Sequence, residues 1–225
     1  MDKKLQFKIF IRALFLQVGW NYRKMQNIGF AFSLLPALKQ IYIGDRLNDA
    51  IIRHLDYFNT QPNMAGFTIG LCVKLEQQAS KLRGQEEISA HEKIKSLKYA
   101  LSTSTAAIGD RLFWGTLKPF SLALSLFIMF AAQPNFINLM HGSFRDVLIT
   151  VLALLAGFLF YNTVGVYIRW KSLEHGYKCA QDRCCGMDFI NWNGVIKKLR
   201  FFGLILVLAS TILFLNNYVS FVFSL

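Results

Sequence analysis

The sequence has 225 residues, of which 54% are hydrophobic, 15% are aromatic and only 17% are charged. This composition excludes an ordinary soluble domain and predicts a protein that is embedded in lipid. The formal net charge of +12 is typical of a membrane protein whose cytosolic loops are rich in Lys and Arg. Because the basic residues are scattered and no nucleic-acid-binding motif occurs, the charge does not predict a nucleic-acid partner.

The N-terminal residues 3–18 predict a basic amphipathic helix. Its apolar and basic residues alternate around the helix: Leu5, Ile9, Leu14 and Leu16 stand among Lys3, Lys4, Lys8 and Arg12. This pattern suits a helix that lies along an anionic membrane surface. Residues 48–58 predict a second amphipathic helix, with Leu55 on its apolar side and His54 on its polar side.

Three further apolar segments are too short to cross a bilayer: residues 28–38, which end near Pro36, residues 62–75 and residues 100–109. We expect them to be re-entrant elements, because backbone at membrane depth must be buried in protein or line a wet cavity. They therefore predict a bundle that encloses a polar site. Residues 76–98 are strongly charged and predict a solvated helical hairpin on the cytosolic side.

Three segments predict transmembrane helices, over residues 119–132, 147–168 and 201–223. The last two carry no charged residue and are long enough for a hydrocarbon core of about 30 Å. The first has a shorter apolar core, so it needs additional residues, or protein around it, to complete a crossing.

The distribution of basic residues assigns the sides of the membrane. Lys and Arg number 17 in residues 1–118, one in residues 133–146 and seven in residues 169–200. The positive-inside rule places the first and last of these segments in the cytosol, which agrees with three crossings. We therefore expect an all-α membrane protein, with amphipathic and re-entrant helices in residues 1–118 and the transmembrane helices in residues 119–225.

Four local strings carry a resemblance to a known family. They are GWNYRKMQNIGFAFSLLPAL at 19–38, RHLDYFNTQP at 53–62, KLEQQ at 74–78 and IGDRLFWGTLKP at 108–119. Together they resemble the IID subunit of mannose, fructose and sorbose phosphotransferase systems, where the third string resembles an acidic turn. Two features depart from the family pattern: Arg111 stands where a Pro is usual, and the chain ends after one further span where typical members continue.

The resemblance implies a sugar permease subunit that is not itself an enzyme. A IID protein resembles one half of a membrane unit whose other half is IIC, while the soluble IIA and IIB subunits carry the phosphate from phosphoenolpyruvate. We therefore expect a hetero-oligomer in the cytoplasmic membrane, with a cytosolic N-terminal part, a hexose or related sugar as substrate and no cofactor. The alternative is a non-transporting scaffold or regulatory subunit derived from the same family.

Two of the matched strings contain side chains suited to binding a sugar. Hydroxyl groups of a sugar exchange hydrogen bonds with amides and carboxylates, and its apolar face packs on aromatic rings. Candidates at the first string are Asn59, Thr60 and Gln61, and candidates at the second are Asp110 and Trp114. The alternatives are that the first three fix a turn, that Asp110 caps a helix over residues 113–117, and that Trp114 only packs.

Cysteine and histidine residues do not predict a metal site. Cys179, Cys184 and Cys185 lie near His175, but their spacing fits no standard zinc pattern. We expect these thiols to be reduced and to face the cytosol. The other histidines, His54, His91 and His141, are isolated in sequence and are expected to be surface or packed helix residues.

Overall fold

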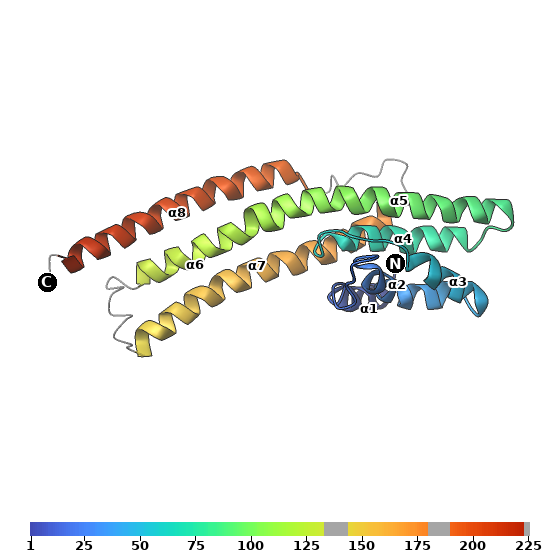
Figure 1. Ribbon diagram of the computed structural model, residues 1–225, viewed down its shortest axis with the longest axis horizontal. Coiled ribbons are helices and arrows are strands. Elements are labelled where there is room, and N and C mark those ends of the chain that lie inside the picture. The colour runs from blue at the N-terminus through green and yellow to red at the C-terminus, as the bar shows by residue number, and fades with distance from the viewer. Residues whose placement is uncertain (133–143, 180–189, 223–225) are drawn as a thin grey trace. The chain divides into compact units, whose positions relative to one another are not determined.

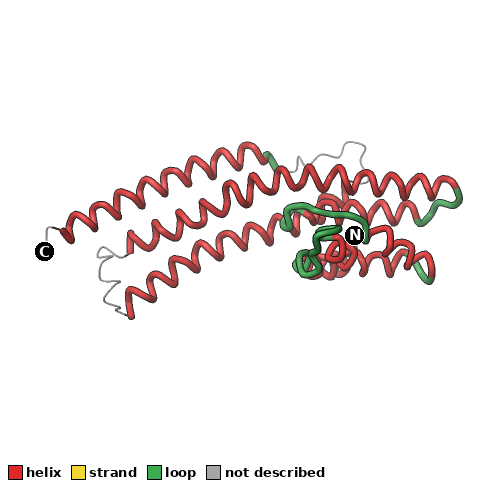
Figure 2. Tube along the Cα trace, viewed as in Figure 1, coloured by secondary structure: helices red, strands yellow, loops and turns green. Residues whose placement is uncertain are grey.

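The computed structural model describes residues 1–132, 144–179 and 190–222, which fold into helices joined by short loops (Figures 1 and 2). The elements are α1 Lys3–Ala13, α2 Asn27–Ile41, α3 Asp45–His54, α4 Ala65–Ala79, α5 Gln85–Gly109, the π-helix η1 Asp110–Leu117, α6 Lys118–Ala132, α7 Phe144–Cys179 and α8 Trp192–Val222. No strand occurs in these residues. The expected all-α fold is therefore confirmed.

The helices form two compact units. Unit 1 comprises Met1–Asp110 and Gly165–Ile190, and unit 2 comprises Arg111–Val164 and Asn191–Leu225. Helix α7 contributes its C-terminal residues to unit 1 and its N-terminal residues to unit 2. The boundary expected near residue 118 remains a prediction about how the chain is organised in a membrane.

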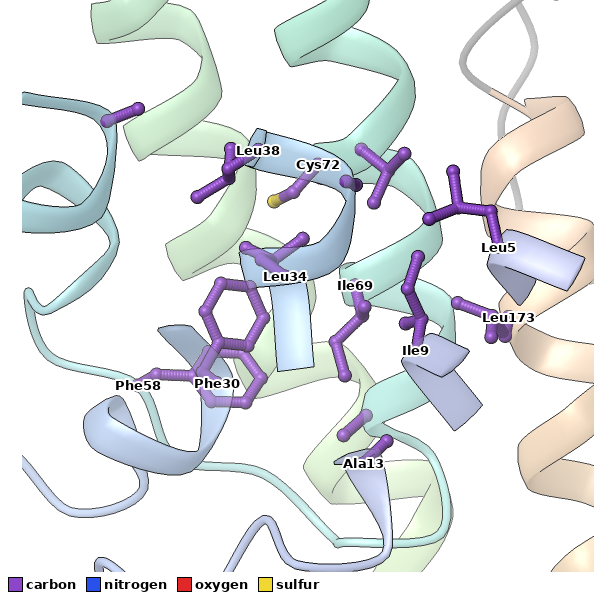
Figure 3. Packing of buried hydrophobic residues seen from close by; sticks show 14 of the residues in the cluster. Leu5, Ile9, Ala13, Phe30, Leu34, Leu38, Phe58, Ile69, Cys72 and Leu173 are labelled. Carbon is purple, nitrogen blue, oxygen red and sulfur yellow. The ribbon is translucent and has the colours of Figure 1, made fainter. Parts of the chain in front are cut away.

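Unit 1 has a closely packed apolar core between α1, α2, α4, α5 and the end of α7 (Figure 3). The labelled core residues are Leu5, Ile9, Ala13, Phe30, Leu34, Leu38, Phe58, Ile69, Cys72 and Leu173. The rings of Phe30 and Phe58 lie 4.1 Å apart between centroids. Burial of side chains of this size stabilises the fold by about 1.5–3 kcal/mol each.

Helix α1 is amphipathic, but its apolar side packs on protein. Leu5, Ile9 and Leu16 are almost fully buried in unit 1. The expectation of a membrane surface against this face is therefore wrong for Leu5, Ile9 and Leu16, which follows α1, whereas Leu14 of the same predicted face is 42% exposed. A period of 3.6 residues marks an apolar face without identifying what covers it.

Helix α2 is longer than the sequence suggested. Helix α2 continues through Pro36 to Ile41, so the expected end near the proline is wrong. Proline lacks the N–H that would bond to the carbonyl four residues earlier, and here that carbonyl, on Phe32, accepts a hydrogen bond from Arg12 Nη1 at 3.3 Å. The predicted re-entrant segments 28–38 and 62–75 coincide with α2 and α4, and their entry into a bilayer remains a prediction.

Glycines allow α4 to approach α7 closely within unit 1. Gly66 and Gly70 are one helical turn apart, and a Cβ on Gly66 would lie 2.6 Å from the carbonyl oxygen of Arg169. A Cβ on Gly70 would lie 2.8 Å from the backbone nitrogen of Tyr177. Two small residues at this spacing are a common means of bringing membrane helices together.

Helix α5 runs without interruption through η1 into α6, so that residues 85–132 form one helix of 48 residues. The expectation of a re-entrant break at residues 100–109 is therefore wrong, and the short span 119–132 is completed by residues upstream of it. Asp110 has helical backbone angles, which excludes its predicted role as a helix N-cap. The π-helix precedes Pro119, whose missing N–H disturbs the regular hydrogen-bond ladder.

Three helices are long and apolar enough to cross a membrane: Gln85–Ala132, Phe144–Cys179 and Trp192–Val219. The expected number of spans is thereby confirmed. In unit 2, α6 packs along α8, and a Cβ on Gly157 of α7 would lie 2.5 Å from the carbonyl oxygen of Ser121 on α6. The loop expected over residues 133–146 lies mostly outside the described residues.

Candidate functional site

The first two matched strings are joined by hydrogen bonds in unit 1. The backbone N–H of Gln26 donates to the carbonyl of Phe58 at 2.8 Å. The side-chain amide of Gln26 donates to the carbonyl of Thr60 at 2.9 Å, and its oxygen accepts the Thr60 N–H at 3.1 Å. Gln26 therefore satisfies both backbone groups of Thr60, as a neighbouring strand would.

Two asparagines strengthen this connection. Asn27 Nδ2 donates to the carbonyl of Leu55 at 2.7 Å, and Asn21 Nδ2 donates to Asn27 Oδ1 at 2.9 Å. The backbones of Asn21 and Met25 exchange two hydrogen bonds, which hold Met25 at the unusual φ of 56°. Such a conformation costs about 1–3 kcal/mol in a non-glycine residue and persists only when its surroundings enforce it.

The predicted site residues of the first string differ in exposure. Asn59 is exposed, whereas Thr60 and Gln61 are buried. The hydroxyls of Thr60 and Thr105 lie 2.7 Å apart, and Gln61 Oε1 accepts the backbone N–H of Asn63 at 2.7 Å. Thr60 and Gln61 thus fix the turn, while Asn59 presents its amide to the outside.

Helix α5 reaches the same turn through a glycine. A Cβ on Gly109 would lie 2.5 Å from Cβ of Gln61, so only glycine permits this close approach. Asp110 follows directly and is exposed. Asn59, Thr60, Gln61 and Asp110 therefore all belong to unit 1.

Two polar residues near this turn were not predicted. Arg169 Nη2 donates to Asn63 Oδ1 at 2.9 Å, and Gly165 lies against the same Asn63 amide. Arg169 is the first basic residue after the uncharged run 147–168. In the sequence it therefore indicated only which side of the membrane follows that run. Asn63 lies one residue beyond the matched string RHLDYFNTQP at 53–62, so the resemblance did not include it.

Trp114 belongs to unit 2. Its side chain is 54% exposed, and Lys118 Nζ lies 4.6 Å from its ring centroid. Both residues line a cavity of about 400 Å³ between α6 and α7. The role of Trp114 in sugar binding remains a prediction.

A buried carboxylate organises the polar interior of unit 1. Glu76 is completely buried, and Arg53 Nη2 donates to its Oε2 at 2.8 Å. His54 Nε2 lies 2.9 Å from Oε1, and Tyr42 Oη donates to Oε2 at 2.8 Å. Helix α4 continues to Ala79, so the acidic turn expected at residues 74–78 is wrong.

Lys98 of α5 is the second buried charge. It is 2% exposed, and its Nζ donates to the backbone carbonyls of His54 at 3.2 Å and Asp56 at 3.1 Å. The Phe30 ring centroid lies 4.7 Å away. The predicted hairpin between α4 and α5 exists, but the expectation that residues 76–98 are all solvated is wrong.

The environment of Glu76 favours its ionised form. Burial alone raises the pKa of this carboxyl, but the hydrogen bonds and charges of His54 and Arg53 outweigh burial and lower it to about 2. Burial lowers the pKa of His54, and Glu76 opposes that effect. Arg53 is charged at any ordinary pH, so it stabilises the Glu76 carboxylate whether or not His54 holds a proton.

In the part of the chain that the structure describes, no group of three or more His, Cys, Asp or Glu residues is arranged to hold a metal ion. His141, Cys184 and Cys185 lie outside the described residues. Cys179 takes part in a disulfide bond, which contradicts the expectation of a reduced thiol at this residue. His175 packs against Phe67, with 5.9 Å between ring centroids.

Comparison with known proteins gives a consistent result. Residues 1–224 match the family described as the PTS system mannose/fructose/sorbose family IID component. The mannose-specific EIID component of Escherichia coli K12 is 33% identical over 176 residues, which are 77% of this chain and 55% of that protein. The fructose permease IID component of Bacillus subtilis is 33% identical over 55% of this chain and 44% of that protein. This chain spans about half the length of these relatives.

Solved structures share the fold. A chain in the cryo-EM structure of the mannose transporter ManYZ with microcin E492 has a TM-score of 0.63 and 28% identity, covering 93% of this chain and 69% of that one. A second structure, described as a membrane protein, has a TM-score of 0.70 and 28% identity, with coverage of 92% and 69%.

Proposed function

Since the chain belongs to the IID component family of mannose/fructose/sorbose phosphotransferase systems, we propose that it is a membrane subunit through which a hexose or related sugar enters the cell. In this role it pairs with a IIC membrane subunit, while soluble IIA and IIB subunits carry the phosphoryl group. The chain itself catalyses no phosphoryl transfer. The match over residues 1–224 is the observation that carries the proposal.

The proposed location is the cytoplasmic membrane, with the N-terminal residues and residues 169–200 on the cytosolic side. Three candidate spans and the excess of Lys and Arg in those two segments support this orientation. A IIB subunit would approach from that side. The ManYZ structure, described as a mannose transporter, supports a second membrane subunit as partner.

The proposed sugar contacts are Asn59 and Asp110, because both side chains are exposed in unit 1. An amide and a carboxylate provide the acceptors and donors that sugar hydroxyls require. Thr60 and Gln61 act indirectly, since their polar groups are engaged in holding the turn. The alternative of a non-transporting scaffold has no observation in its favour among the described residues.

The test is phosphoenolpyruvate-dependent uptake of labelled mannose, fructose and sorbose in cells that express the chain with its IIC, IIB and IIA partners. Asn59→Ala and Asp110→Asn should each lower uptake about tenfold, the effect of losing about 1.4 kcal/mol of hydrogen bonding. Asn48→Ala and Asp49→Asn are matched controls, because both residues are exposed on α3. They should leave uptake unchanged.

The two possible negative results of the uptake assay lead to different conclusions. If the unaltered chain supports uptake but Asn59→Ala and Asp110→Asn do not lower it, the site assignment is wrong while the subunit role stands. If the chain supports no uptake of any of the three sugars although the other subunits are functional, the transport role itself is wrong.

A further inference from the structure

We propose that the cavity between α6 and α7 in unit 2 binds one anionic phospholipid, with its headgroup at Lys118 and an acyl chain along the apolar wall. The cavity has a volume of about 400 Å³. The proposed sugar contacts Asn59 and Asp110 do not line it. The proposal therefore goes beyond the transport role and does not depend on it.

The cavity has a polar end and an apolar end. Trp114 on η1 and Lys118 on α6 line the polar end together with Tyr161 and Asn162 on α7. Further along, the wall is formed by apolar side chains that are more than half exposed: Leu122 (56%), Leu154 (55%) and Phe158 (63%). An occupant of this groove must therefore be charged or polar at one end and apolar along its length.

Gly157 and two serines shape the floor of the groove. A Cβ on Gly157 would lie 2.5 Å from the carbonyl oxygen of Ser121, so the two helices approach closely below the groove. The hydroxyl of Ser121 donates to the carbonyl of Leu117 at 2.7 Å, and that of Ser125 donates to the carbonyl of Ser121 at 3.1 Å. Their hydrogen-bonding capacity is directed into the helix, which leaves a smooth, weakly polar floor suited to an acyl chain.

The charge at the polar end has no internal counterion. The described residues of unit 2, 111–132, 144–164 and 191–222, contain six Lys and Arg and one acidic residue, Asp146, which precedes Asn162 of the polar end by 16 residues on α7. The π-helix η1 lies beside α8, since Arg200 Nε donates to Thr116 Oγ1 at 3.2 Å. Among the described residues, Lys118 has a cation–π contact with Trp114 but no ion pair. An anionic headgroup would neutralise this end.

Lipid fits the groove better than a sugar or a soluble anion. Both helices are candidate membrane spans, so the apolar wall faces hydrocarbon unless protein covers it. A hexose has no charged group that could pair with Lys118, and it has no long apolar part that could cover the apolar end of the cavity. A Trp beside a basic residue is typical of the level of lipid headgroups, and basic pockets between membrane helices commonly bind anionic lipids.

The experiment counts lipids bound to the full chain by native mass spectrometry, with the chain purified in detergent alone and together with its co-expressed IIC partner. Phosphatidylglycerol is titrated against phosphatidylcholine with the same acyl chains, and glycerol 3-phosphate serves as the headgroup alone. One phosphatidylglycerol should be retained in both preparations with an affinity about fivefold above phosphatidylcholine, as expected for one basic residue near an anionic headgroup.

Substitutions distinguish a binding site at Lys118 from a general effect of the positive charge at this end of unit 2. Lys118→Gln should abolish the fivefold preference, and Lys118→Arg should keep it. Lys197→Gln is the matched control, because Lys197 is exposed on α8 and does not line the cavity. It removes the same charge and should keep the preference.

Several results would overturn the proposal. Equal retention of the two lipids by the unaltered chain would exclude an anionic headgroup site. If Lys118→Gln and Lys197→Gln lose the preference for phosphatidylglycerol equally, the preference comes from the overall positive charge and not from a site at Lys118. If glycerol 3-phosphate displaces the lipid, the acyl chain does not bind in the cavity. Loss of the lipid whenever the IIC partner is bound would show that the groove is a protein interface.

Discussion

Glu76 and His54 lie in contact inside unit 1, with 2.9 Å between Oε1 and Nε2 and almost no exposure of either side chain. Arg53 completes the arrangement with a bidentate contact to the same carboxylate. A buried charge is tolerated only when it is paired and hydrogen-bonded. The stability of unit 1 should therefore depend on this carboxylate.

Glu76→Gln is expected to destabilise the protein by about 3–5 kcal/mol, because it leaves the Arg53 charge unpaired beside the core. The measurement is the thermal midpoint of the full chain in detergent, followed by fluorescence-detected size exclusion. Glu174→Gln is the control, since Glu174 pairs with Lys171 and Lys178 at the surface, where an ion pair contributes about 1 kcal/mol or less. Equal midpoint shifts in the two variants would contradict the assigned role.

Stability should also fall in acid because of Glu76. Burial raises the pKa of Glu76, but His54 and Arg53 lower it from 4.5 to about 2, so the unfolded chain binds this proton more readily than the folded protein. The resulting stabilisation is present above about pH 4.5 and is lost as the pH falls towards 2. The thermal midpoint should drop between pH 5 and pH 3, and should drop less in Glu76→Gln.

His54 adds to the same trend at higher pH. Burial lowers its pKa below the ordinary 6.5, so the unfolded chain takes up a proton at a pH where the folded protein resists it. Stability should therefore begin to decline below pH 6.5. His54→Gln should remove this upper part of the decline and leave the part below pH 4.5, and a midpoint that rises between pH 6.5 and pH 5 would contradict the assignment to His54.

The membrane spans could be predicted because they are local properties of the sequence. Uncharged runs marked α7 and α8, and the structure extends both beyond those runs. The re-entrant element expected over residues 100–109 was wrong because this apolar run, judged alone, is too short to cross a bilayer, whereas the helix continues through it. Gly109 accommodates the side chain of Gln61, a contact from a segment 48 residues away that composition cannot show.

The buried charges could not be predicted for a related reason. Glu76 looks solvated in a charged stretch, but its partners Arg53 and His54 come from 23 and 22 residues earlier in the chain. The candidate site was located only in part: the matched string identified Asn59, whereas the supporting role of Gln26 depends on a contact across 34 residues. Helical periodicity shows which residues share a face and not what packs against that face.

The close approach of α4 and α7 gives a fourth prediction. Gly70→Ala places a methyl group against the backbone of Leu173 and Tyr177, and we expect a loss of about 1–3 kcal/mol despite the better helix propensity of alanine. Gly203→Ala is the matched control, because the nearest atom to its Cβ would be a ring carbon of Phe120 at 3.4 Å. Gly203→Ala should be neutral or slightly stabilising, and an equal loss in both would contradict close packing.

The reciprocal pair between Gln26 and Thr60 gives the last prediction, which connects the fold to the proposed site. Gln26→Ala leaves the backbone N–H and carbonyl of Thr60 without their partners, and an unsatisfied buried group costs about 1–3 kcal/mol. We expect a lower thermal midpoint and, because the adjacent Asn59 loses its fixed position, a higher KM for sugar uptake. Gln17→Ala is the control, since Gln17 is exposed.

Gln26→Ala and Asn59→Ala should then differ in a diagnostic way. Asn59 is exposed at the turn, so its truncation should lower uptake without changing the thermal midpoint, whereas Gln26→Ala should change both. Lowering the temperature of the uptake assay should restore much of the activity of Gln26→Ala, because the turn is then more fully folded, and none of the activity of Asn59→Ala. If both variants lose stability equally, Asn59 is part of the scaffold and the proposed sugar contact at this turn is wrong.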